Sequence, residues 1–382
     1  MYETTMTGSF FRTKEIEELL RKSSTGEIDN THDHIIRSAE SLAISDQLHP
    51  LGSKSGLTWV SNGEQRKSGY TTYIPNRFHG FSTKNRVSQQ FSEAFYNELM
   101  EANPYMGKVI QESKVFELPA IEDKLVYTGE KQSRKEAEDA RKLAKELGAK
   151  RIFIPAPSPG VITVFYPPGK TYHDHEDYLF DLSRELAKEY RSILSVDGVD
   201  LQIDAPDLAM AKSLGVDWTE KFFDVLPKHV QAINDAIKGL PPERIRVHYC
   251  YGNYSASHLT DPDYSNILPE LLKLKAGTIV GEMANARHAG DPLIIRKHVK
   301  EYGWPKNMKF AVGVVDVKSP FVETPEAVSQ KLHNVSDIDD IGEERVFGGT
   351  DCGFETFSGM GGVPKNIALH KLKSLAEGAA VE

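Results

Sequence analysis

The chain has 382 residues, a formal net charge of −9 and 39% hydrophobic residues, a composition typical of globular proteins. The negative charge argues against nucleic acid or an anionic membrane as the main partner, and no apolar run approaches the length of a transmembrane helix. Only two cysteines occur, Cys250 and Cys352, so the chain is not a disulfide scaffold. Without a signal peptide at the N-terminus, we expect a reducing, cytoplasmic location.

Short apolar segments that predict buried strands alternate with amphipathic segments that predict helices. The predicted strands are Thr4–Met6, Leu57–Val60, Arg151–Pro155, Val199–Ile203, Ile245–Tyr249, Thr278–Gly281, Lys309–Val314 and Arg345–Gly348. The predicted helices are Thr13–Lys22, Arg134–Leu147, His175–Leu194, Thr219–Ile237, Pro325–His333 and Pro364–Leu375. Eight strands alternating with helices predict an α/β fold, a single (β/α)₈ TIM barrel over residues 1–382 with all strands parallel.

Residues 66–130, after the second predicted strand, do not follow this alternation. They contain Tyr70–Pro75, a predicted amphipathic helix near Val87–Leu99, and Val115–Leu118. The segment is polar and holds too few apolar residues for a core of its own. We therefore predict an insertion that forms a lid over one mouth of the barrel, not an independent domain.

Candidate metal ligands follow three of the predicted strands, where barrel enzymes carry their catalytic groups. His248 and Cys250 stand two residues apart at the end of the fifth strand, so their side chains point the same way. Glu282 follows the sixth strand and Cys352 the eighth. Taken singly, each has an ordinary structural explanation, such as a buried apolar cysteine or a loop carboxylate. Together, one imidazole, two thiolates and a carboxylate form a ligand set that zinc favours.

Seven segments make the chain similar to a known family: TGSFFRT at 7–13, SNGEQR at 61–66, LQIDAPDLA at 201–209, VHYCYGN at 247–253, IVGEMANAR at 279–287, GVVDVKSP at 313–320 and TDCGFET at 350–356. They resemble the catalytic C-terminal barrel of cobalamin-independent methionine synthases. The resemblance implies that His248, Cys250, Glu282 and Cys352 hold Zn²⁺, and that the substrate thiol joins the zinc as a thiolate and is then methylated. Glu282 is the ligand expected to loosen.

The resemblance also implies a site for homocysteine. Two acids would hold its amino group, and a glycine and a serine after the first strand would hold its carboxylate; these residues are Glu64, Asp204, Gly8 and Ser9. Two carboxylates around an ammonium group are chemically sound, since each forms a charge-assisted hydrogen bond. The alternative is that Glu64 and Asp204 cap loops or pair with Arg66 and Lys212.

The chain departs from the family on the side of the methyl donor. Lys318 stands where the family usually has a histidine that protonates the leaving folate amine, and a lysine is a poorer acid near neutral pH. Met210 stands about where a further acidic residue is expected. We expect Asp316 and Lys318 to contact the donor or an anionic group. The donor stays open among a methylfolate, a methylcorrinoid and an epoxide.

These patterns predict a zinc-dependent S-methyltransferase, similar to 5-methyltetrahydropteroyltriglutamate–homocysteine methyltransferase. Its partners are a small thiol and an alkyl donor, and homo-oligomer formation is left open. The alternative from a different class of enzyme is a zinc-dependent transferase or lyase that joins a thiol to an epoxide. The non-enzymatic alternative is a protein for zinc storage or corrinoid docking.

Overall fold

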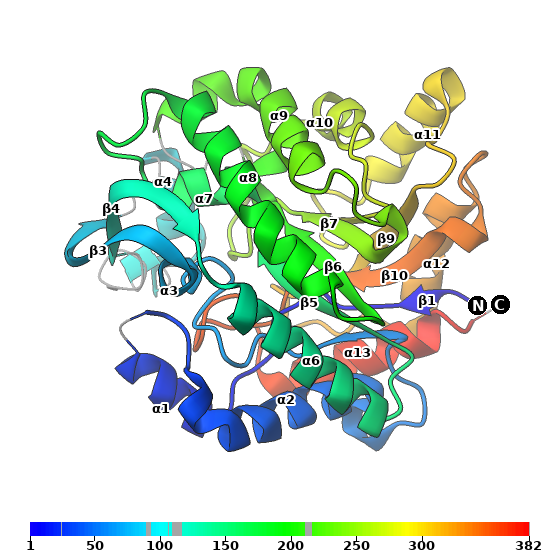
Figure 1. The fold of residues 1–382 in the computed structure, drawn as a ribbon. Coiled ribbons are helices and arrows are strands. Elements are labelled where there is room, and N and C mark those ends of the chain that lie inside the picture. Colours follow the sequence, from blue (N-terminus) through cyan, green and yellow to red (C-terminus); the bar gives the residue numbers. More distant parts are fainter. Residues whose placement is uncertain (24, 89–92, 106, 109–116, 211–215, 382) are drawn as a thin grey trace.

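The computed structural model describes residues 1–23, 25–88, 93–105, 107–108, 117–210 and 216–381, and Figure 1 shows its fold. Its central sheet has eight strands: β1 (Glu3–Thr4), β2 (Trp59–Ser61), β5 (Arg151–Pro157), β6 (Val199–Asp204), β7 (Ile245–Tyr249), β8 (Thr278–Gly281), β9 (Lys309–Val315) and β10 (Val346–Thr350). The strand order is β1-β10-β9-β8-β7-β6-β5-β2, and each neighbouring pair is parallel. A parallel bridge between Thr5 and Trp59 closes the barrel between β1 and β2. The predicted (β/α)₈ barrel is confirmed, and each predicted strand overlaps an observed one.

Helices surround the barrel (Figure 1). Those that match a prediction are α1 (Lys14–Lys22), α6 (Glu130–Glu146), α8 (His175–Leu194), α9 (Val216–Ala236), α12 (Pro325–Ser336) and α13 (Lys365–Gly378). Several begin at a side chain that accepts a hydrogen bond from a free backbone N–H of the first turn, the usual N-cap arrangement; these caps are Thr13 for α1, Asp174 for α8 and Thr324 for α12.

Five described α-helices have no counterpart among the predicted helices: α2 (Asp33–Leu48), α3 (Ile74–Arg77), α7 (Pro159–Phe165), α10 (Tyr264–Leu271) and α11 (Asp291–Tyr302). All residues of α7 are buried, so it shows no amphipathic pattern. Pro269 lies inside α10 and weakens the helical signal there. In contrast, α2 buries Ile36, Ala39 and Ala43 at helical spacing, so its sequence could have predicted a helix.

Between β2 and β5 the chain forms α3 (Ile74–Arg77), β3 (Phe78–Ser88), α4 (Glu93–Ala102) and β4 (Glu117–Tyr127). Strands β3 and β4 form a separate antiparallel sheet at the side of the barrel (Figure 1). The predicted helix near Val87–Leu99 is wrong at its start, because Val87 belongs to β3 and pairs with Leu118. Residues 89–92 and 115–116 of the predicted segments lie outside the described residues. The insertion after the second strand is confirmed; its role as a lid stays a prediction.

Side chains from several strands fill the barrel interior. One cluster consists of Trp59, Phe153, Val280, Ala311 and Phe347. The buried guanidinium of Arg246 on β7 lies 4.2 Å from the ring centre of Phe153 and donates a hydrogen bond to Thr5 Oγ1 at 2.9 Å. The interior is thus a packed core, which leaves the ends of the strands for chemistry.

The chain ends close to where it starts. The backbone N–H of Tyr2 donates to the carbonyl of Ala379 at 3.0 Å, and Figure 1 shows the two termini beside each other. Among the described residues, no helix has both the length and the apolar character that a membrane span requires.

Candidate metal and substrate site

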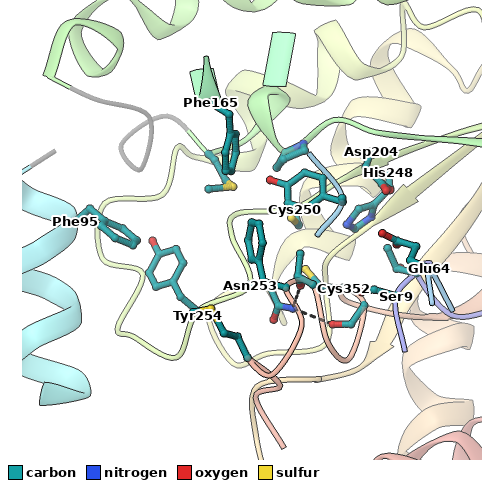
Figure 2. Close-up of a pocket in the computed structure, with 18 residues that line it drawn as sticks. Ser9, Glu64, Phe95, Phe165, Asp204, His248, Cys250, Asn253, Tyr254 and Cys352 are labelled. Atoms are coloured by element: carbon teal, nitrogen blue, oxygen red, sulfur yellow. Dashed lines mark hydrogen bonds between the residues drawn. The ribbon is translucent and has the colours of Figure 1, made fainter. Parts of the chain in front are cut away.

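A cavity of about 130 Å³ lies at the carboxyl ends of the barrel strands (Figure 2). Six of the predicted site residues line it: Ser9, Glu64, Asp204, His248, Cys250 and Cys352. The rest of its wall is mainly aromatic and apolar, with Tyr70, Phe95, Phe165, Met210, Tyr254 and Phe357. The other four predicted residues, Gly8, Glu282, Asp316 and Lys318, lie outside this lining.

Three of the four predicted metal ligands meet in the cavity. The ligand atoms of His248, Cys250 and Cys352 all lie within 4.8 Å of one another, and all three residues are buried. Since His248 Nδ1 is 3.2 Å from the carbonyl oxygen of Val280, that nitrogen must carry a proton and donate. The other ring nitrogen, Nε2, is therefore the one free to bind a metal, the arrangement usual for histidine ligands. The three side chains fit a zinc ion by donor type and by spacing.

The two thiols differ in acidity. The hydrogen bond from the Cys352 thiol, opposed by burial and assisted by His248, lowers the pKa of Cys250 to about 5. The pKa of Cys352 rises well above its usual value, because it is the hydrogen-bond donor and is also buried. Burial opposes a charge on His248, but its hydrogen bond to Cys250 raises the pKa of the imidazole overall. The site thus already stabilises a thiolate, the form of cysteine that binds metals.

Asn253, which the sequence did not single out, connects the loops that carry the two cysteines. Its Nδ2 donates to the carbonyl of Gly353 at 2.8 Å and to Thr356 Oγ1 at 2.5 Å, as Figure 2 shows. The Thr350 hydroxyl donates to the carbonyl of Cys352 at 2.8 Å. These bonds link the loop after Cys250 to the loop that carries Cys352.

Asp351, also absent from the prediction, ties the loop of Cys352 to the loop after β8. Its Oδ1 accepts the backbone N–H groups of Met283 at 2.9 Å and Ala284 at 2.8 Å. Burial raises the pKa of the Asp351 carboxyl to about 7. The sequence offers one signal for Asp351: it directly precedes the predicted ligand Cys352, and residues next to metal ligands often position them.

Glu282, the fourth predicted ligand, is bonded to protein groups on both oxygens. Oε1 accepts hydrogen bonds from Lys318 Nζ and from Asn285 Nδ2, the latter at 2.8 Å, and Oε2 accepts the backbone N–H of Tyr251 at 2.9 Å. Burial alone would raise the pKa of this carboxyl, but the Lys318 ammonium lowers it overall. Glu282 is thus ionised beside the cluster of three and is not a member of it.

Of the two predicted contacts to the donor, Lys318 has its ammonium on Glu282, and Asp316 binds the Lys318 backbone. Burial disfavours the charged lysine, but the Glu282 carboxylate raises the pKa of Lys318 well above its usual value. The Lys318 backbone N–H donates to Asp316 Oδ1 at 2.8 Å. A lysine held as an ammonium in this way is not poised to release a proton to a leaving group.

Glu64 lies at the same end of the cavity as His248 and Asp204 (Figure 2). Its backbone φ is +56°, a strained value for a side chain with a Cβ and one that recurs at functional sites. Burial raises the pKa of its carboxyl to about 7, and the neighbouring Asp204 contributes. Its Oε2 is buried and has no hydrogen-bond partner among the described residues. Gly8 is needed beside it, because a Cβ there would lie 2.7 Å from Glu64 Oε1.

Asp204 ends β6 and pairs in register with His248 on β7, so it lies beside the metal cluster, and its charge also acts on Glu64. Gln202 Nε2 donates to its Oδ1 at 2.7 Å, and burial raises the pKa of its carboxyl to about 6. The alternative that Arg66 pairs with Glu64 finds no support. Arg66 contacts instead two other carboxylates, Glu40 at 3.5 Å and Asp139 at 3.4 Å. Lys212 lies outside the described residues.

Comparisons of the sequence agree on one family. A family model described as "Cobalamin-independent synthase, Catalytic domain" matches residues 183–376, about half of the chain. A protein named methionine synthase from Saccharolobus solfataricus is 25% identical over 99% of this chain and 94% of its own length. Another of that name, from Sulfurisphaera tokodaii, is 24% identical over 99% of this chain and 91% of its own length.

Solved structures share the fold. A B12-independent methionine synthase from Shewanella sp. W3-18-1, in complex with selenomethionine, matches with a TM-score of 0.69 and 20% identity. The match covers 99% of this chain and 97% of that one. A methyltransferase from Methanosarcina mazei matches with a TM-score of 0.51 and 12% identity, over 98% and 93% of the two chains. At these identities the matches support the barrel architecture.

Proposed function

Because the chain belongs to the cobalamin-independent methionine synthase family, we propose that this methyltransferase transfers a methyl group to the sulfur of homocysteine and so makes methionine. The observation that carries the proposal is the pairing of two kinds of group in one cavity. The candidate metal-binding cluster of His248, Cys250 and Cys352 lies beside an acidic pair, Glu64 and Asp204, and all five residues line the same cavity. The selenomethionine in the Shewanella structure is the selenium counterpart of the proposed product.

His248 Nε2 and the two cysteine sulfurs would hold the zinc ion. Zinc bound there lowers the pKa of a substrate thiol and so keeps its sulfur in the nucleophilic thiolate form at neutral pH. Asn253 and Thr350 hold the two cysteine loops in place. Glu282, the fourth ligand implied by the family, stays a predicted ligand.

The acidic pair would hold the substrate's ammonium group. Glu64 offers a buried oxygen with no partner among the described residues, and a carboxylate in that state is stabilised by a cationic ligand. The substrate carboxylate would then lie near Gly8 and Ser9, of which Ser9 lines the cavity. This recognition favours an amino-acid thiol over a thiol without an amine.

Transfer itself forms one bond and breaks one. The electron pair of the substrate sulfur forms the new bond to the methyl carbon, and the bond between carbon and donor breaks with its electron pair leaving on the donor. The proton of the thiol is lost before attack. Aromatic side chains, among them Phe95, Phe165 and Tyr254, exclude water from the cavity and so protect the methyl group from hydrolysis.

The donor must leave without help from Lys318, since its ammonium is bound by Glu282. A folate amine needs a proton to leave, whereas a methylcorrinoid does not. We therefore favour a methylcorrinoid over a methylfolate. The methionine synthase names of the two sequence relatives give the epoxide alternative no support.

The 66–130 segment is proposed to act as a lid within one barrel domain. Phe95 of α4 lines the cavity and packs edge-on against Tyr254, with ring centres 4.8 Å apart. Glu98 on the same helix accepts the Ser257 hydroxyl at 2.7 Å and the Leu259 N–H at 2.9 Å. Both partners belong to the loop that follows Cys250, so the segment contacts the metal-ligand loop directly.

A cytoplasmic location is the expected setting for this chemistry. Both cysteines are free and buried in the structure, and a thiol pair that must bind metal needs a reducing compartment.

Product analysis tests the proposed function. The zinc-loaded protein would be incubated with homocysteine and, separately, with methylcobalamin, methyltetrahydrofolate and a small epoxide, and the thioether identified by mass spectrometry. Methionine from methylcobalamin is the expected result, and Cys352→Ser should abolish it. A hydroxyalkyl thioether formed only with the epoxide would overturn the proposal, and methionine formed only with the folate would overturn the choice of donor.

A further inference from the structure

Arg12 is a buried cation near the substrate site that the proposed function does not use. It lies in the loop after β1, between Ser9 and the helix α1. Its side chain is 0% exposed, and it is not among the residues that line the cavity. A buried charge is stable only when it is paired and hydrogen-bonded. The partners of Arg12 therefore show which parts of the site it holds together.

One nitrogen of Arg12 binds the loop that carries Glu64. Its Nη2 donates to the carbonyl of Glu64 at 3.3 Å and to the carbonyl of Lys67 at 3.0 Å. The same Glu64 carbonyl accepts the Lys67 N–H at 3.0 Å, and the Glu64 N–H donates to Asn62 Oδ1 at 3.0 Å. Both polar groups of the Glu64 backbone are thus held, and Arg12 binds both ends of the turn from Glu64 to Lys67.

The other terminal nitrogen of Arg12 binds the loop after β10. Its Nη1 donates to the carbonyl of Glu355 and lies 3.5 Å from Glu355 Oε2. The Arg12 backbone N–H donates to the same Oε2 at 2.8 Å, and Glu355 Oε1 accepts the Gly359 N–H at 3.3 Å. Thr356 and Phe357, which follow Glu355, line the cavity. Arg12 therefore joins the loops after β1, β2 and β10.

The Glu64 backbone needs such support. Its φ of +56° lies in the left-handed region, which a residue with a Cβ rarely adopts and keeps only where the surrounding structure enforces it. The direction of the Cα–Cβ bond follows from φ and ψ. A Glu64 that relaxed to a negative φ would therefore direct its carboxylate elsewhere, away from its present place beside Gly8 in the cavity wall.

The charge of Arg12 acts in the same direction as its hydrogen bonds. Burial and the neighbouring Asp204 raise the pKa of the Glu64 carboxyl to about 7, whereas Arg12 and Lys67 lower it. The ammonium of Lys67 is also bound by Glu136 at 3.0 Å. Arg12 thus favours the ionised carboxylate that a substrate ammonium group needs.

We propose that Arg12 is a positioning residue for substrate recognition. By binding the carbonyls of Glu64 and Lys67, it keeps the Glu64 carboxylate directed at the ammonium group of an amino-acid thiol. The inference rests on the proposed function, because it takes homocysteine as the ligand of the cavity. A guanidinium suits this task, since its N–H groups lie in one fixed plane and bind several acceptors at once.

The test measures the preference for an amino-acid thiol in the zinc-loaded full chain. Calorimetry gives the dissociation constants of homocysteine and of 4-mercaptobutanoate, the same thiol without its amine, with no methyl donor present. Arg12→Met removes the guanidinium and keeps an unbranched side chain. We expect it to reduce the preference for homocysteine at least about tenfold, since a hydrogen bond to a charged group is worth about that factor or more.

The thiol without the amine separates positioning of Glu64 from general damage. Arg12→Met should change the affinity for 4-mercaptobutanoate less than about threefold, because that thiol makes no ammonium contact. Equal losses for the two thiols would overturn the proposal. Arg12→Met combined with Glu64→Gln should have the preference of Glu64→Gln alone, and a further loss in the double variant would overturn the proposal as well.

A second double variant guards against misfolding. Arg12→Met with Glu355→Gln removes both charges of the buried pair, so it should fold even if Arg12→Met does not. It should still lack the preference for homocysteine, because nothing replaces the bonds to the carbonyls of Glu64 and Lys67. A restored preference would overturn the proposal and assign the effect to the loop after β10.

Arg12→Lys tests geometry against charge. A lysine keeps the positive charge, but its single nitrogen cannot bind the loops after β2 and β10 together, so we expect the preference to fall at least about threefold. Full rescue by lysine would overturn the role of the guanidinium bridge. A wild type without any preference for homocysteine would refute the proposed function and this inference together. A preference that is the same in the wild type and in Arg12→Met would refute the role of Arg12 alone.

Discussion

Two buried glutamates follow barrel strands in this molecule, and their surroundings are opposite. Glu64, after β2, and Glu282, after β8, are 2% and 1% exposed. Glu282 has an ammonium group and two other donors on its carboxylate, and the pKa of its carboxyl is lowered overall. In contrast, Glu64 has an oxygen without a partner among the described residues, and burial together with Asp204 raises the pKa of its carboxyl to about 7.

The difference indicates which carboxylate is available to a ligand. A buried acid whose hydrogen bonds are all made by the protein serves the fold, because a ligand could bind it only by displacing those partners. A buried acid that lacks a partner costs free energy until a cation arrives. We therefore propose that Glu64 recognises the substrate, whereas the hydrogen bonds of Glu282 are made within the protein.

Among substitutions around the two glutamates, the largest expected effect is on the free energy of unfolding. Lys67 lies near Glu64, but its ammonium is 3.0 Å from Glu136 and donates to the carbonyl of Pro155 at 3.2 Å. Lys67→Met should lower the free energy of unfolding by about 3 kcal/mol, because it leaves a buried carboxylate with one cation fewer. Lys135→Met, at a pair whose side chain is 33% exposed, should cost below about 1 kcal/mol. Equal losses in urea denaturation would mean that the buried network is not what stabilises this side of the barrel.

The next effect concerns substrate affinity. Glu64→Gln should raise the KM for homocysteine about 10- to 100-fold, since a hydrogen bond to a charged group is worth about 1.5–3 kcal/mol. The matched substrate is 4-mercaptobutanoate, which is homocysteine without its amine. The variant should treat the two thiols alike, while the wild type should prefer homocysteine. An unchanged preference in the variant would remove the ammonium role from Glu64.

A pH dependence follows from the raised pKa of Glu64. The substrate ammonium stays charged between pH 5 and 8, and the carboxyl must lose its proton to bind it. Affinity for homocysteine should therefore fall as pH drops below about 7, by up to about tenfold per pH unit, and level off above. Thiol ionisation affects both thiols equally, so the ratio of their KM values isolates the carboxyl; a flat ratio would contradict this assignment.

The raised pKa of Glu64 also affects folding stability, which should change with pH in the direction opposite to substrate affinity. The folded state of the free protein retains a proton on Glu64 up to about pH 7, whereas an unfolded chain loses it near its ordinary pKa. The stabilising contribution of this group is therefore present at acidic pH and is lost as pH rises towards 7. Glu64→Gln should flatten that part of the stability profile in thermal unfolding.

The smallest effect concerns a single donor to Glu282. Asn285→Ala removes one hydrogen bond but leaves Lys318 and the Tyr251 N–H in place. We expect a change in zinc affinity of less than about threefold, because a typical hydrogen bond contributes about 1 kcal/mol net and two partners remain. A change above tenfold in chelator competition would mean that the amide, and not the lysine, controls the carboxylate.

The barrel and the metal cluster could both be predicted from the sequence, because both follow from the positions of the strands. Parallel strands bring their carboxyl ends together, so His248, Cys250 and Cys352, which stand at or after strand ends, had to meet once the strand order was known. The helix α7 escaped prediction because complete burial removes its amphipathic pattern.

The partners of the two glutamates could not be predicted in this way. Glu282 and Lys318 are 36 residues apart and follow different strands. Their positions at strand ends predict that they lie in the same region, but not that they form a hydrogen bond with each other. Asn253 and Asp351 contact distant backbone groups near the candidate metal ligands, and such contacts leave no pattern in the local sequence. The state of each carboxylate depends on such contacts and is visible only in three dimensions.

The most direct test of the account is X-ray absorption at the zinc edge of the loaded protein, before and after addition of homocysteine. We expect two sulfur ligands before and three after, because the protein would supply two thiolates and the substrate the third. The count should stay at three sulfurs in Glu64→Gln once the thiol concentration is raised to saturation. A sulfur count that remains at two in the wild type at saturating homocysteine would contradict the central claim that this cavity activates the substrate sulfur at the metal.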